Sequence, residues 1–526
     1  MQQWVVPTDA VRWTGSRSLV LRRCGPPDGF YGPAEDTYDM QRSHTLLLST
    51  LAVAAAALAL SGCTDEKIVY RDGTNFAAPK AAAANFVGYS DATNKKTVCG
   101  SCHAEIQASW VDTKHAVAWS DLVASGSQAG YCNGCHTTGA YGNLATAGGF
   151  AGDSTTARYH DVQCESCHGA GLTHISSPTS GNRPLASIKA DTGLANGCGE
   201  CHSGSHDPFL EEWKVSGHSK TFATSHSSTD PSCQACHTAQ GFLTTQANVT
   251  HNYVEKNGAM LDVTCAACHD PHGSANSAQL RFPINTTNLD NNLCTKCHRR
   301  NGTSAEVTTR NSVHSPEGPT LFGTAGWIPA SMVNGGAIVS SHGDATKNPG
   351  LCATCHVSKY EGTDPLTKTT VFSTGHRFLA TPCVGANGLP TVAQDCEIAT
   401  QSFRSCVSGG CHGSETLARN ATVTAEARVT LLVGEANRLI TLIKAGPKAA
   451  DCTFATTKAY SVCNGVQFNI SLTSKAGGII HNPFLLEQLM IASINQLKSD
   501  YGVVAAAGID LTPQLQKAAK GFAGGR

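Results

Sequence analysis

Two apolar patterns near the C-terminus predict helices. Between Ala425 and Lys444, apolar residues recur at spacings of three and four, which is typical of a helix with one buried face. A second helix is predicted to begin at Asn482, a good N-cap residue, with Pro483 in the first helical position. We therefore expect residues 421–526 to form a helical C-terminal region that packs on the rest of the chain.

The long middle of the chain shows few sustained periodic segments. Residues 97–420 are rich in Gly, Ser, Thr, Asn and Pro, a composition that usually gives poor order. Aromatic residues make up only 6% of the 526 residues, which is little for a large core of side chains. We expect short helices, little regular secondary structure and a bound group that supplies the missing apolar mass.

An apolar run near the N-terminus predicts an export signal. A short polar stretch from Met40 precedes the run Thr45–Leu60, which ends in Leu-Ser-Gly before Cys63. This ending resembles a bacterial lipobox, and the resemblance implies lipidation of Cys63. A membrane-spanning helix is the alternative, but the run is shorter than the roughly 20 residues that a span needs. We expect a leader at 1–39 that is an artefact of the assigned start codon, a lipoprotein signal peptide at 40–62 and a tether at 63–96.

The charge and the cysteine content narrow the class of protein. The formal net charge is −1, and no basic block is present that could neutralise phosphates, which argues against nucleic acid as the partner. The 24 cysteines are too many for a reduced cytosolic enzyme of this size, unless they are ligands or attachment points.

Sixteen of the cysteines lie in eight copies of the motif C-x-x-C-H. Two thiols at this spacing can form thioethers to the two vinyl groups of one porphyrin, and the adjoining His can bind its iron. Zinc or a redox disulfide could explain a single C-x-x-C pair, but neither requires a His after every second Cys. We therefore interpret the motifs as attachment sites for haem c and its iron, with these residues: Cys99, Cys102 and His103; Cys132, Cys135 and His136; Cys164, Cys167 and His168; Cys198, Cys201 and His202; Cys233, Cys236 and His237; Cys265, Cys268 and His269; Cys294, Cys297 and His298; and Cys352, Cys355 and His356.

A widened copy suggests a ninth site. Cys406 and Cys411 are separated by four residues rather than two, and His412 follows. Gly409 and Gly410 can adopt the unusual dihedrals that would bring the two thiols together. A disulfide beside an incidental His is the alternative, so the expected number of haems is eight or nine.

Four further cysteines are predicted to form disulfides. Cys383 with Cys396, and Cys452 with Cys463, each enclose a short loop, and neither Cys396 nor Cys463 is followed by His. We therefore predict two local disulfides, as is typical of a protein in an oxidising compartment.

The second axial ligand of each iron is expected to be His. Beyond Cys63 the chain has three Met residues, too few for nine irons, whereas twelve His remain after the nine motif His and His44 are set aside. The surroundings of His160 and His251 are the least distinctive of the twelve. The other ten are the candidate distal ligands: His115, His174, His206, His218, His226, His272, His314, His342, His376 and His481.

Several short sequence segments around these His residues resemble the sequences of a known family. The phrases CESCHGAGLTH, CAACHDPHG, CHSGSHDPFLEEW and IIHNPFLLEQL are similar to those of the periplasmic and outer-surface multihaem c-type cytochromes of metal-reducing bacteria. The resemblance implies a haem-packed core, distal ligands often supplied to a haem other than the nearest in sequence, and electron transfer in respiration to extracellular metal oxides. The expected partners are other redox proteins, the oxides and a membrane reached through Cys63.

The density of motifs favours conduction over catalysis. One haem for about every 35 residues between Cys99 and His412 would place the porphyrins nearly in contact, and two His ligands would close each iron to substrate. We therefore expect an exported, lipid-anchored electron carrier at the outer membrane or cell surface, with the periplasmic face as the alternative, and not an enzyme. The alternatives are a reductase of nitrite, hydroxylamine or sulfur oxyanions with one open haem, and a subunit of a polymeric cytochrome filament.

Overall fold

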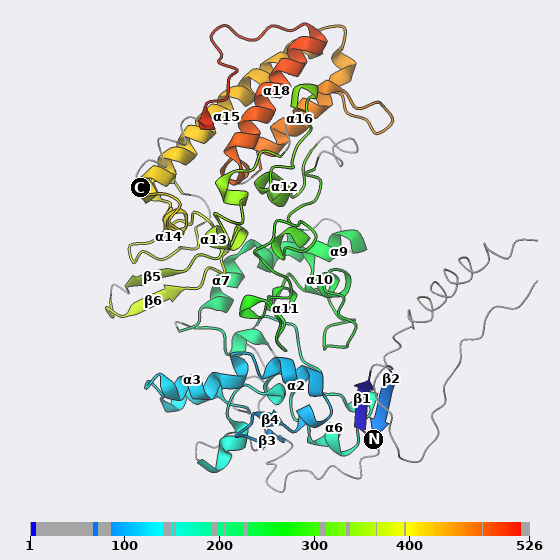
Figure 1. Cartoon of the computed structure of the whole chain (residues 1–526), viewed down its shortest axis with the longest axis vertical. Helices are drawn as coiled ribbons and strands as arrows, with labels where there is room; N and C mark the ends of the chain where they lie inside the picture. The colour runs from blue at the N-terminus through cyan, green and yellow to red at the C-terminus, as the bar shows by residue number, and fades with distance from the viewer. Residues whose placement is uncertain are drawn as a thin grey trace, which may run out of the picture. The chain divides into compact units, whose positions relative to one another are not determined.

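The structure is a computed structural model (Figure 1) that describes residues 2–6, 67–71, 86–139, 150, 154–191, 197–204, 206–224, 230–303, 312–332, 337–363, 366–393, 396–475 and 477–516. It divides into two units that are described separately: residues 1–78 with 173–183, and residues 79–172 with 184–526. The predicted signal peptide at 40–62, the predicted lipidation site Cys63 and most of the predicted leader lie outside the described residues. Within the described part of the chain, no helix combines the length and the apolar character that crossing a membrane requires.

The smaller unit contains one pair of strands. Strand β1 (Gln2–Val6) runs antiparallel to β2 (Lys67–Arg71), which lies inside the stretch predicted as a tether. In its second segment, Thr179 caps the short 3-10 helix Ser180–Asn182 in a capping box with Asn182.

The larger unit is packed from Phe86 onward. Phe86, Val87 and Tyr89 are buried, and Tyr89 packs in a cluster with Trp110. Strand β3 (Tyr89–Asp91) pairs with β4 (Lys96–Thr97) in an antiparallel ladder. The packed structure thus begins before residue 97, the boundary expected from composition, because these apolar side chains have partners far along the chain.

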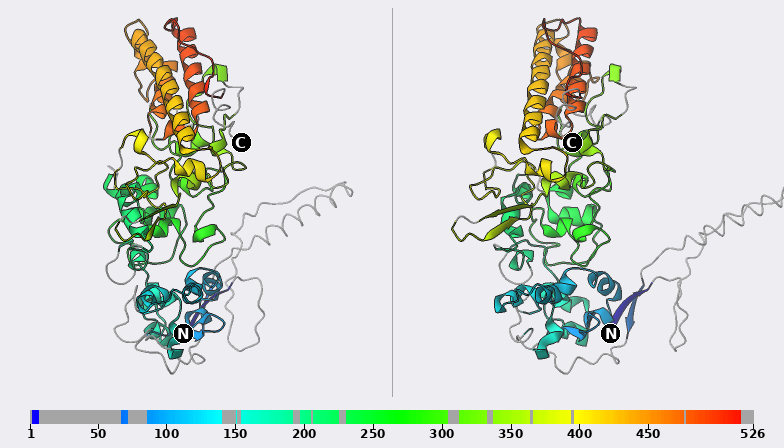
Figure 2. Two further views of the ribbon diagram at one scale, coloured as in Figure 1. Left: turned by 90° about the vertical axis from the view of Figure 1, so that its left-hand side faces the viewer. Right: turned by 60° about the vertical axis from the view of Figure 1, so that its left-hand side comes forward.

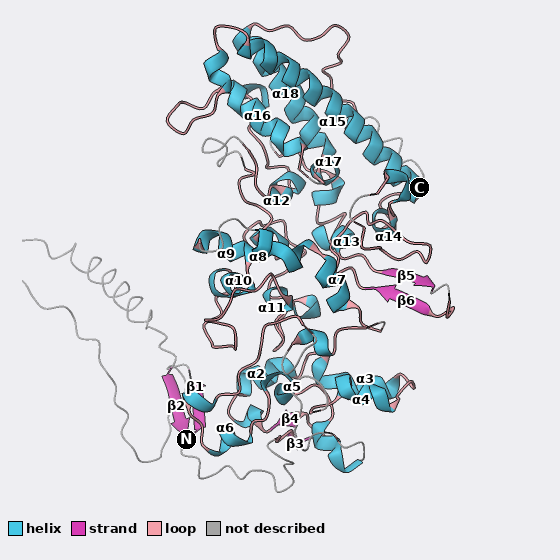
Figure 3. Ribbon diagram, turned by 180° about the vertical axis from the view of Figure 1, so that it is seen from behind, coloured by secondary structure: helices cyan, strands magenta, loops and turns pink. Residues whose placement is uncertain are grey.

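Short helices and loops make up most of the larger unit before residue 415 (Figure 3). Among the described residues after β4, strands pair in one antiparallel hairpin. It is formed by β5 (Tyr360–Thr363) and β6 (Thr370–Ser373). This agrees with the predicted fold class. The α-helices are α2 (Ala104–Trp110), α3 (Ala118–Ala124), α4 (Asn133–His136), α5 (Cys164–His168), α6 (Leu172–Ser176, which crosses into the smaller unit), α7 (Phe209–Val215), α8 (Thr221–Thr224), α9 (Pro231–His237), α10 (Ala239–Thr245), α11 (Cys265–Cys268), α12 (Glu317–Leu321), α13 (Cys352–His356) and α14 (Arg404–Ser408).

The C-terminal region is a bundle of longer helices. Helices α15 (Glu415–Lys444), α16 (Val462–Thr473) and α18 (Pro483–Tyr501) run side by side (Figures 1 and 2), and α17 (Gly478–His481) precedes α18. Both predicted helices are confirmed, and α15 begins ten residues earlier than the periodic pattern. The side chain of Asn482 caps α18 by accepting the N–H of Leu485 at 3.1 Å.

The bundle has a conventional apolar core. Leu432, Leu439, Val466 and Ile494 are fully buried in one cluster, and burying a Leu or Ile side chain contributes about 2 kcal/mol. Helix α16, which the sequence pattern did not reveal, packs closely on Trp327. It can do so because residue 465 is Gly: a Cβ there would lie 2.1 Å from a ring carbon of Trp327.

Candidate functional site

The C-x-x-C-H motifs fold as short helical turns, the fifth of them at the end of α9. In four of them the N–H of the His donates to the C=O of the first Cys, at 2.9–3.1 Å, for His103, His202, His269 and His298. The turn places both thiols and the imidazole on a short, rigid piece of backbone, and this local geometry follows from the five-residue motif itself.

The widened motif forms the same hydrogen bond, from its His to the carbonyl of its first Cys. The N–H of His412 donates to the C=O of Cys406 at 3.2 Å, despite the two extra residues. The additional backbone is taken up at Gly410, whose φ of +70° is a conformation that Gly adopts without strain. The loop therefore presents His412 much as the narrower motifs present their His.

Seven pairs of imidazoles bring a motif His together with a His outside the motifs. Their ring centroids are 6.1–6.3 Å apart, and the angle between the ring planes ranges from 24° to 75°. The pairs are His115–His202, His168–His272, His218–His298, His237–His314, His269–His376, His342–His412 and His356–His481.

This separation fits two imidazoles on opposite sides of one metal ion. A metal–imidazole bond is about 2 Å long and the ring centre lies about 1.1 Å behind the nitrogen, so two opposed rings should be about 6.2 Å apart. The seven pairs come from different segments and yet differ by only 0.2 Å between 6.1 and 6.3 Å. The donor set is therefore suited to an iron porphyrin with two His ligands.

The other predicted distal His residues have different positions. The Nδ1 atom of His174 lies 3.2 Å from Oδ1 of Asn182. His206 is exposed in a turn, and His226 lies outside the described residues. His160, which was not among the candidates, stacks on the ring of Trp119 with centroids 4.3 Å apart.

Backbone carbonyls orient many of the imidazoles through Nδ1. When Nδ1–H donates to a carbonyl, the other ring nitrogen keeps its lone pair for a metal ion. The N···O distances are 2.7–3.2 Å for His136 to Ala118, His168 to Pro184, His237 to Thr221, His269 to Ala278, His342 to Ile480 and His356 to Phe378.

Two imidazoles face a carboxylate. Nδ1 of His298 lies 3.4 Å from Oε2 of Glu317. Burial opposes a charge on His298, but the hydrogen bond and charge of Glu317 outweigh it and raise the His298 pKa. Nδ1 of His272 lies 3.3 Å from Oδ1 of Asp270, and that carboxylate also binds the guanidinium of Arg281 at 2.8 Å.

Burial keeps several of the non-motif imidazoles neutral. It lowers the pKa of four of them to about 4, with a smaller contribution from the charge of neighbouring His residues. A neutral imidazole is the form that binds a metal ion. The four residues are His115, His218, His376 and His481.

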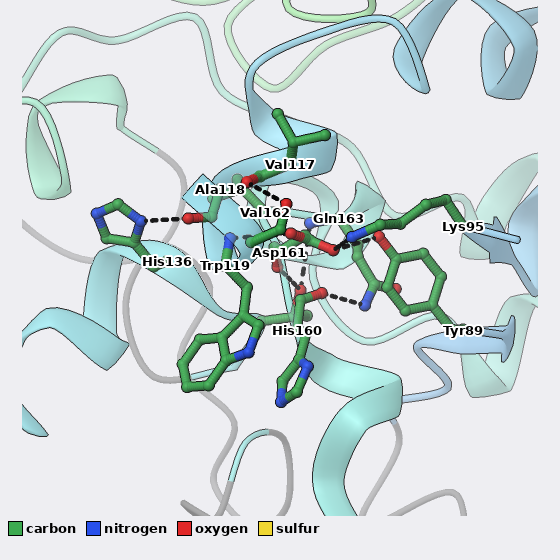
Figure 4. A network of polar contacts seen from close by, with 12 residues as sticks. Tyr89, Lys95, Val117, Ala118, Trp119, His136, His160, Asp161, Val162 and Gln163 are labelled. Atoms are coloured by element: carbon green, nitrogen blue, oxygen red, sulfur yellow. Dashed lines mark hydrogen bonds and ion pairs between the residues drawn. The ribbon is translucent and has the colours of Figure 1, made fainter. Parts of the chain in front are cut away.

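A buried carboxylate organises the segments around the second motif (Figure 4). Asp161 accepts the hydroxyl of Tyr89 and the N–H of Trp119, both at 2.9 Å, and it pairs with the ammonium of Lys95. Trp119 directly follows Ala118, whose carbonyl accepts Nδ1–H of His136. Asp161 therefore holds in place the backbone that orients one motif imidazole.

Two further buried glutamates have similar roles. Glu165, inside the third motif, accepts the backbone N–H groups of Val87, Gly88 and Gly171 at 2.8–3.0 Å. Glu212 accepts those of Thr374 and His376 at 2.7–2.8 Å. Each is 2% exposed. The sequence alone does not reveal the roles of Asp161, Glu165 and Glu212, because nothing in their local sequence distinguishes them from surface acids.

Cysteines of different motifs contact one another. In five pairs, a side-chain interaction with a thiol of another motif shifts the pKa of a motif thiol. In addition, Sγ of Cys236 lies 3.9 Å from the carbonyl oxygen of Lys296, a residue inside the seventh motif. In a haem-loaded chain these atoms would be thioether sulfurs, so the contacts show how closely the attachment points pack. The pairs are Cys99–Cys164, Cys135–Cys201, Cys198–Cys265, Cys236–Cys297 and Cys294–Cys352.

Both predicted disulfides are confirmed. Cys383 is bonded to Cys396, and Cys452 to Cys463. The two bridged pairs are therefore those that the sequence predicted.

Comparison with known proteins identifies the class. Residues 98–169 match the family cytochrome c554 and c-prime, and residues 251–303 match the doubled CXXCH motif. C-type polyheme cytochrome OmcB from two strains of Geobacter sulfurreducens is 25% identical over 316 residues, which are 55% of this chain and 34% of the relative. The match thus spans about a third of the length of these relatives. No solved structure matches the chain.

The repeated motifs, the paired imidazoles and these matches define one class. The chain is a multihaem c-type cytochrome that carries covalently bound haem c with its iron. It is similar to the C-type polyheme cytochrome OmcB of Geobacter sulfurreducens.

Proposed function

We propose that the nine motifs attach nine haems, and that at least seven of the irons have two His ligands. The observation that carries the proposal is the set of seven imidazole pairs, each of which joins one motif His to one His from elsewhere at 6.1–6.3 Å. The proposed distal ligands are His115, His218, His272, His314, His342, His376 and His481, and the candidates for the remaining irons are His174, His206 and His226.

The arrangement of these residues favours electron transfer over the chemical conversion of a substrate. Haem iron supplies reversible one-electron chemistry, and two His ligands generally hold its potential low. The paired imidazoles would occupy both axial positions of a bound haem. Burial keeps four of them neutral, and backbone carbonyls orient five others. A substrate would find no free axial position at such a site, so these sites are expected to pass electrons rather than to bind and convert a molecule.

The packing of the motifs supports conduction from site to site. Electron tunnelling falls steeply with distance, and thiols of different motifs lie near enough to shift one another's pKa. The attachment points are therefore close enough for successive electron transfers along the chain. We propose that this relay is the activity of the protein.

The number of haems can be tested by removing one pair of attachment cysteines. We expect the wild-type chain, matured in a competent host, to carry the mass of nine haems, and the variant C406A/C411A to carry eight. The control variant C383A/C396A, which removes a disulfide only 10 residues upstream by sequence, should keep nine. A wild-type mass with eight haems, unchanged in C406A/C411A, would rule out the ninth site.

Spectroscopy separates a carrier from a reductase. If the sites act in relay, the ferric protein should show low-spin haem with two imidazole ligands, and CO should cause little change in the reduced spectrum. A large CO-induced shift or a strong high-spin ferric signal would reveal an open iron and favour a reductase instead.

We further propose that the protein is exported, anchored through a lipid on Cys63 and used in respiration to external acceptors such as metal oxides. The lipobox-like ending supports the anchor, and two disulfides are typical of an oxidising compartment. The variant C63A should leave the membrane fraction, whereas the control C383A/C396A, which removes a disulfide far from the predicted signal peptide, should remain there. Retention of C63A in membranes would contradict the lipid anchor.

A further inference from the structure

One phenylalanine contacts two of the proposed distal ligands. The ring of Phe378 meets the imidazole of His218 edge to face, with centroids 4.5 Å apart and planes at 81°. The same ring meets His376 at 5.5 Å and 64°. Phe378 therefore lies between the axial ligands of two different proposed haems.

His218 and His376 belong to the two imidazole pairs whose interplanar angles differ most. The planes of His218 and His298 are 75° apart, the largest angle of the set. The planes of His269 and His376 are 24° apart, the smallest. Phe378 thus separates a nearly perpendicular pair from a nearly parallel one.

The backbone of Phe378 has an unusual conformation. Its φ of +57° lies in the left-handed region, which bulky residues rarely adopt, and such outliers persist only where the surroundings enforce them. Here the N–H of Phe378 donates to Gly375 at 3.1 Å, and its carbonyl accepts Nδ1–H of His356 at 2.8 Å. Phe378 therefore contacts three proposed axial ligands, His218, His376 and His356. Each of the three is proposed to bind a different haem.

His376 is confined from the other side as well. Phe209 meets its ring at 4.7 Å with planes at 80°, and also meets His202 at 5.6 Å and 86°. The carboxylate of Glu212, which is 2% exposed, accepts the backbone N–H of His376 at 2.7 Å. With its backbone fixed and its ring between Phe209 and Phe378, His376 has little freedom to rotate.

We propose that Phe378 is a positioning residue that fixes the ring planes of His218 and His376, and thereby sets the electronic character of two haems. The inference rests on the proposed ligation by two His residues. Contacts from neighbouring side chains orient metal-bound imidazoles. In low-spin ferric haem, the angle between the two imidazole planes governs the anisotropy of the electron paramagnetic resonance signal: perpendicular planes give a large-g signal, and parallel planes give a rhombic one.

Three substitutions separate the ring from the backbone. F378L keeps an apolar side chain without the aromatic edge, F378G removes the ring and accepts the positive φ without strain, and F378Y keeps the ring. Electron paramagnetic resonance spectra and haem content should be recorded on the full holoprotein. The matched control is F372L, because Phe372 lies six residues earlier on β6 and is 51% exposed.

We expect F378L and F378G to keep the wild-type haem content, to lose intensity from the large-g signal of one haem and to change the rhombic signal of another. F378Y and F372L should match the wild type. Unchanged signals in both F378L and F378G would overturn the inference, as would loss of haem in both variants, because the ring would then be structural. If the wild-type spectrum itself lacks signals of haem with two imidazoles, the proposed function fails instead.

Discussion

His342 and His412 face each other with ring centroids 6.2 Å apart, although His412 follows the widened motif. His342 is oriented from the C-terminal region, since its Nδ1–H donates to the carbonyl of Ile480 at 2.7 Å. The helical bundle and the motif segment therefore build this pair together. The geometry favours a ninth haem over a disulfide between Cys406 and Cys411.

The first prediction concerns the role of His342. In H342A the iron held by His412 should lose its second imidazole, and about one haem in nine should become high-spin and bind CO. Optical difference spectra of the reduced protein with CO would measure this fraction. H251A is the control, because His251 is exposed and is not a proposed ligand. Equal CO binding by H342A and the wild type would show that His342 is not an axial ligand.

The sequence was sufficient for the attachment motifs but not for the pairing of the ligands. Cys, Cys and His are adjacent within each motif, so local geometry alone brings them together. The partner of His202 is His115, which precedes it by 87 positions and follows a different motif. Such pairing depends on the tertiary packing of loops with little periodicity, and composition or spacing cannot reveal it.

The same limit explains the side chains that were missed. Glu165 and Glu212 look like surface acids, because their acceptor role appears only when distant backbone N–H groups converge on them. Phe378 stands out through its positive φ, which no local pattern predicts. The helices α15 and α18 were predictable because a helix that buries one face against neighbours needs a regular apolar pattern.

A second prediction compares two carboxylates beside axial ligands. Glu317 lies 3.4 Å from Nδ1 of His298, and its negative charge favours the ferric state of that haem. In E317Q the midpoint potential of this haem should rise by on the order of 50 mV, close to a tenfold change in the equilibrium constant for one electron. A spectroelectrochemical titration of the holoprotein would detect the shift in one component of the curve.

D270N is the matched comparison for E317Q. Asp270 lies at a similar distance from His272, but Arg281 binds the same carboxylate at 2.8 Å and offsets its charge. The potential should therefore change less in D270N than in E317Q. A larger shift in D270N, or a fall in potential in E317Q, would contradict this electrostatic account.

A third prediction concerns the buried ion pair of the helical bundle. Nε of Arg428 on α15 donates to Oε1 of Glu487 on α18 at 2.8 Å, and the two side chains are 7% and 1% exposed. R428M would leave the carboxylate buried without its cation, which should lower the free energy of unfolding by about 3–5 kcal/mol. Urea unfolding followed by far-ultraviolet circular dichroism would measure it. The exposed pair of Lys114 and Asp121 provides the control: K114M should change stability by less than about 1 kcal/mol.

The last prediction links the stability of the bundle to one haem. The disulfide Cys452–Cys463 closes an 11-residue separation that ends in the first turn of α16, and a loop of this size contributes about 3 kcal/mol by restricting the unfolded chain. His481, at the end of α17, faces His356 with centroids 6.1 Å apart. Loss of the bundle should therefore withdraw the second ligand from the haem held by His356.

In C452A/C463A we expect the helical signal to melt at a lower temperature than in the wild type, and one haem to become high-spin in the same transition. H481A serves as the reference, because it should show one high-spin haem at every temperature while the bundle stays folded. If the helices of C452A/C463A melt early and all the haems remain low-spin, then the bundle does not supply an axial ligand, and His481 must be removed from the proposed set.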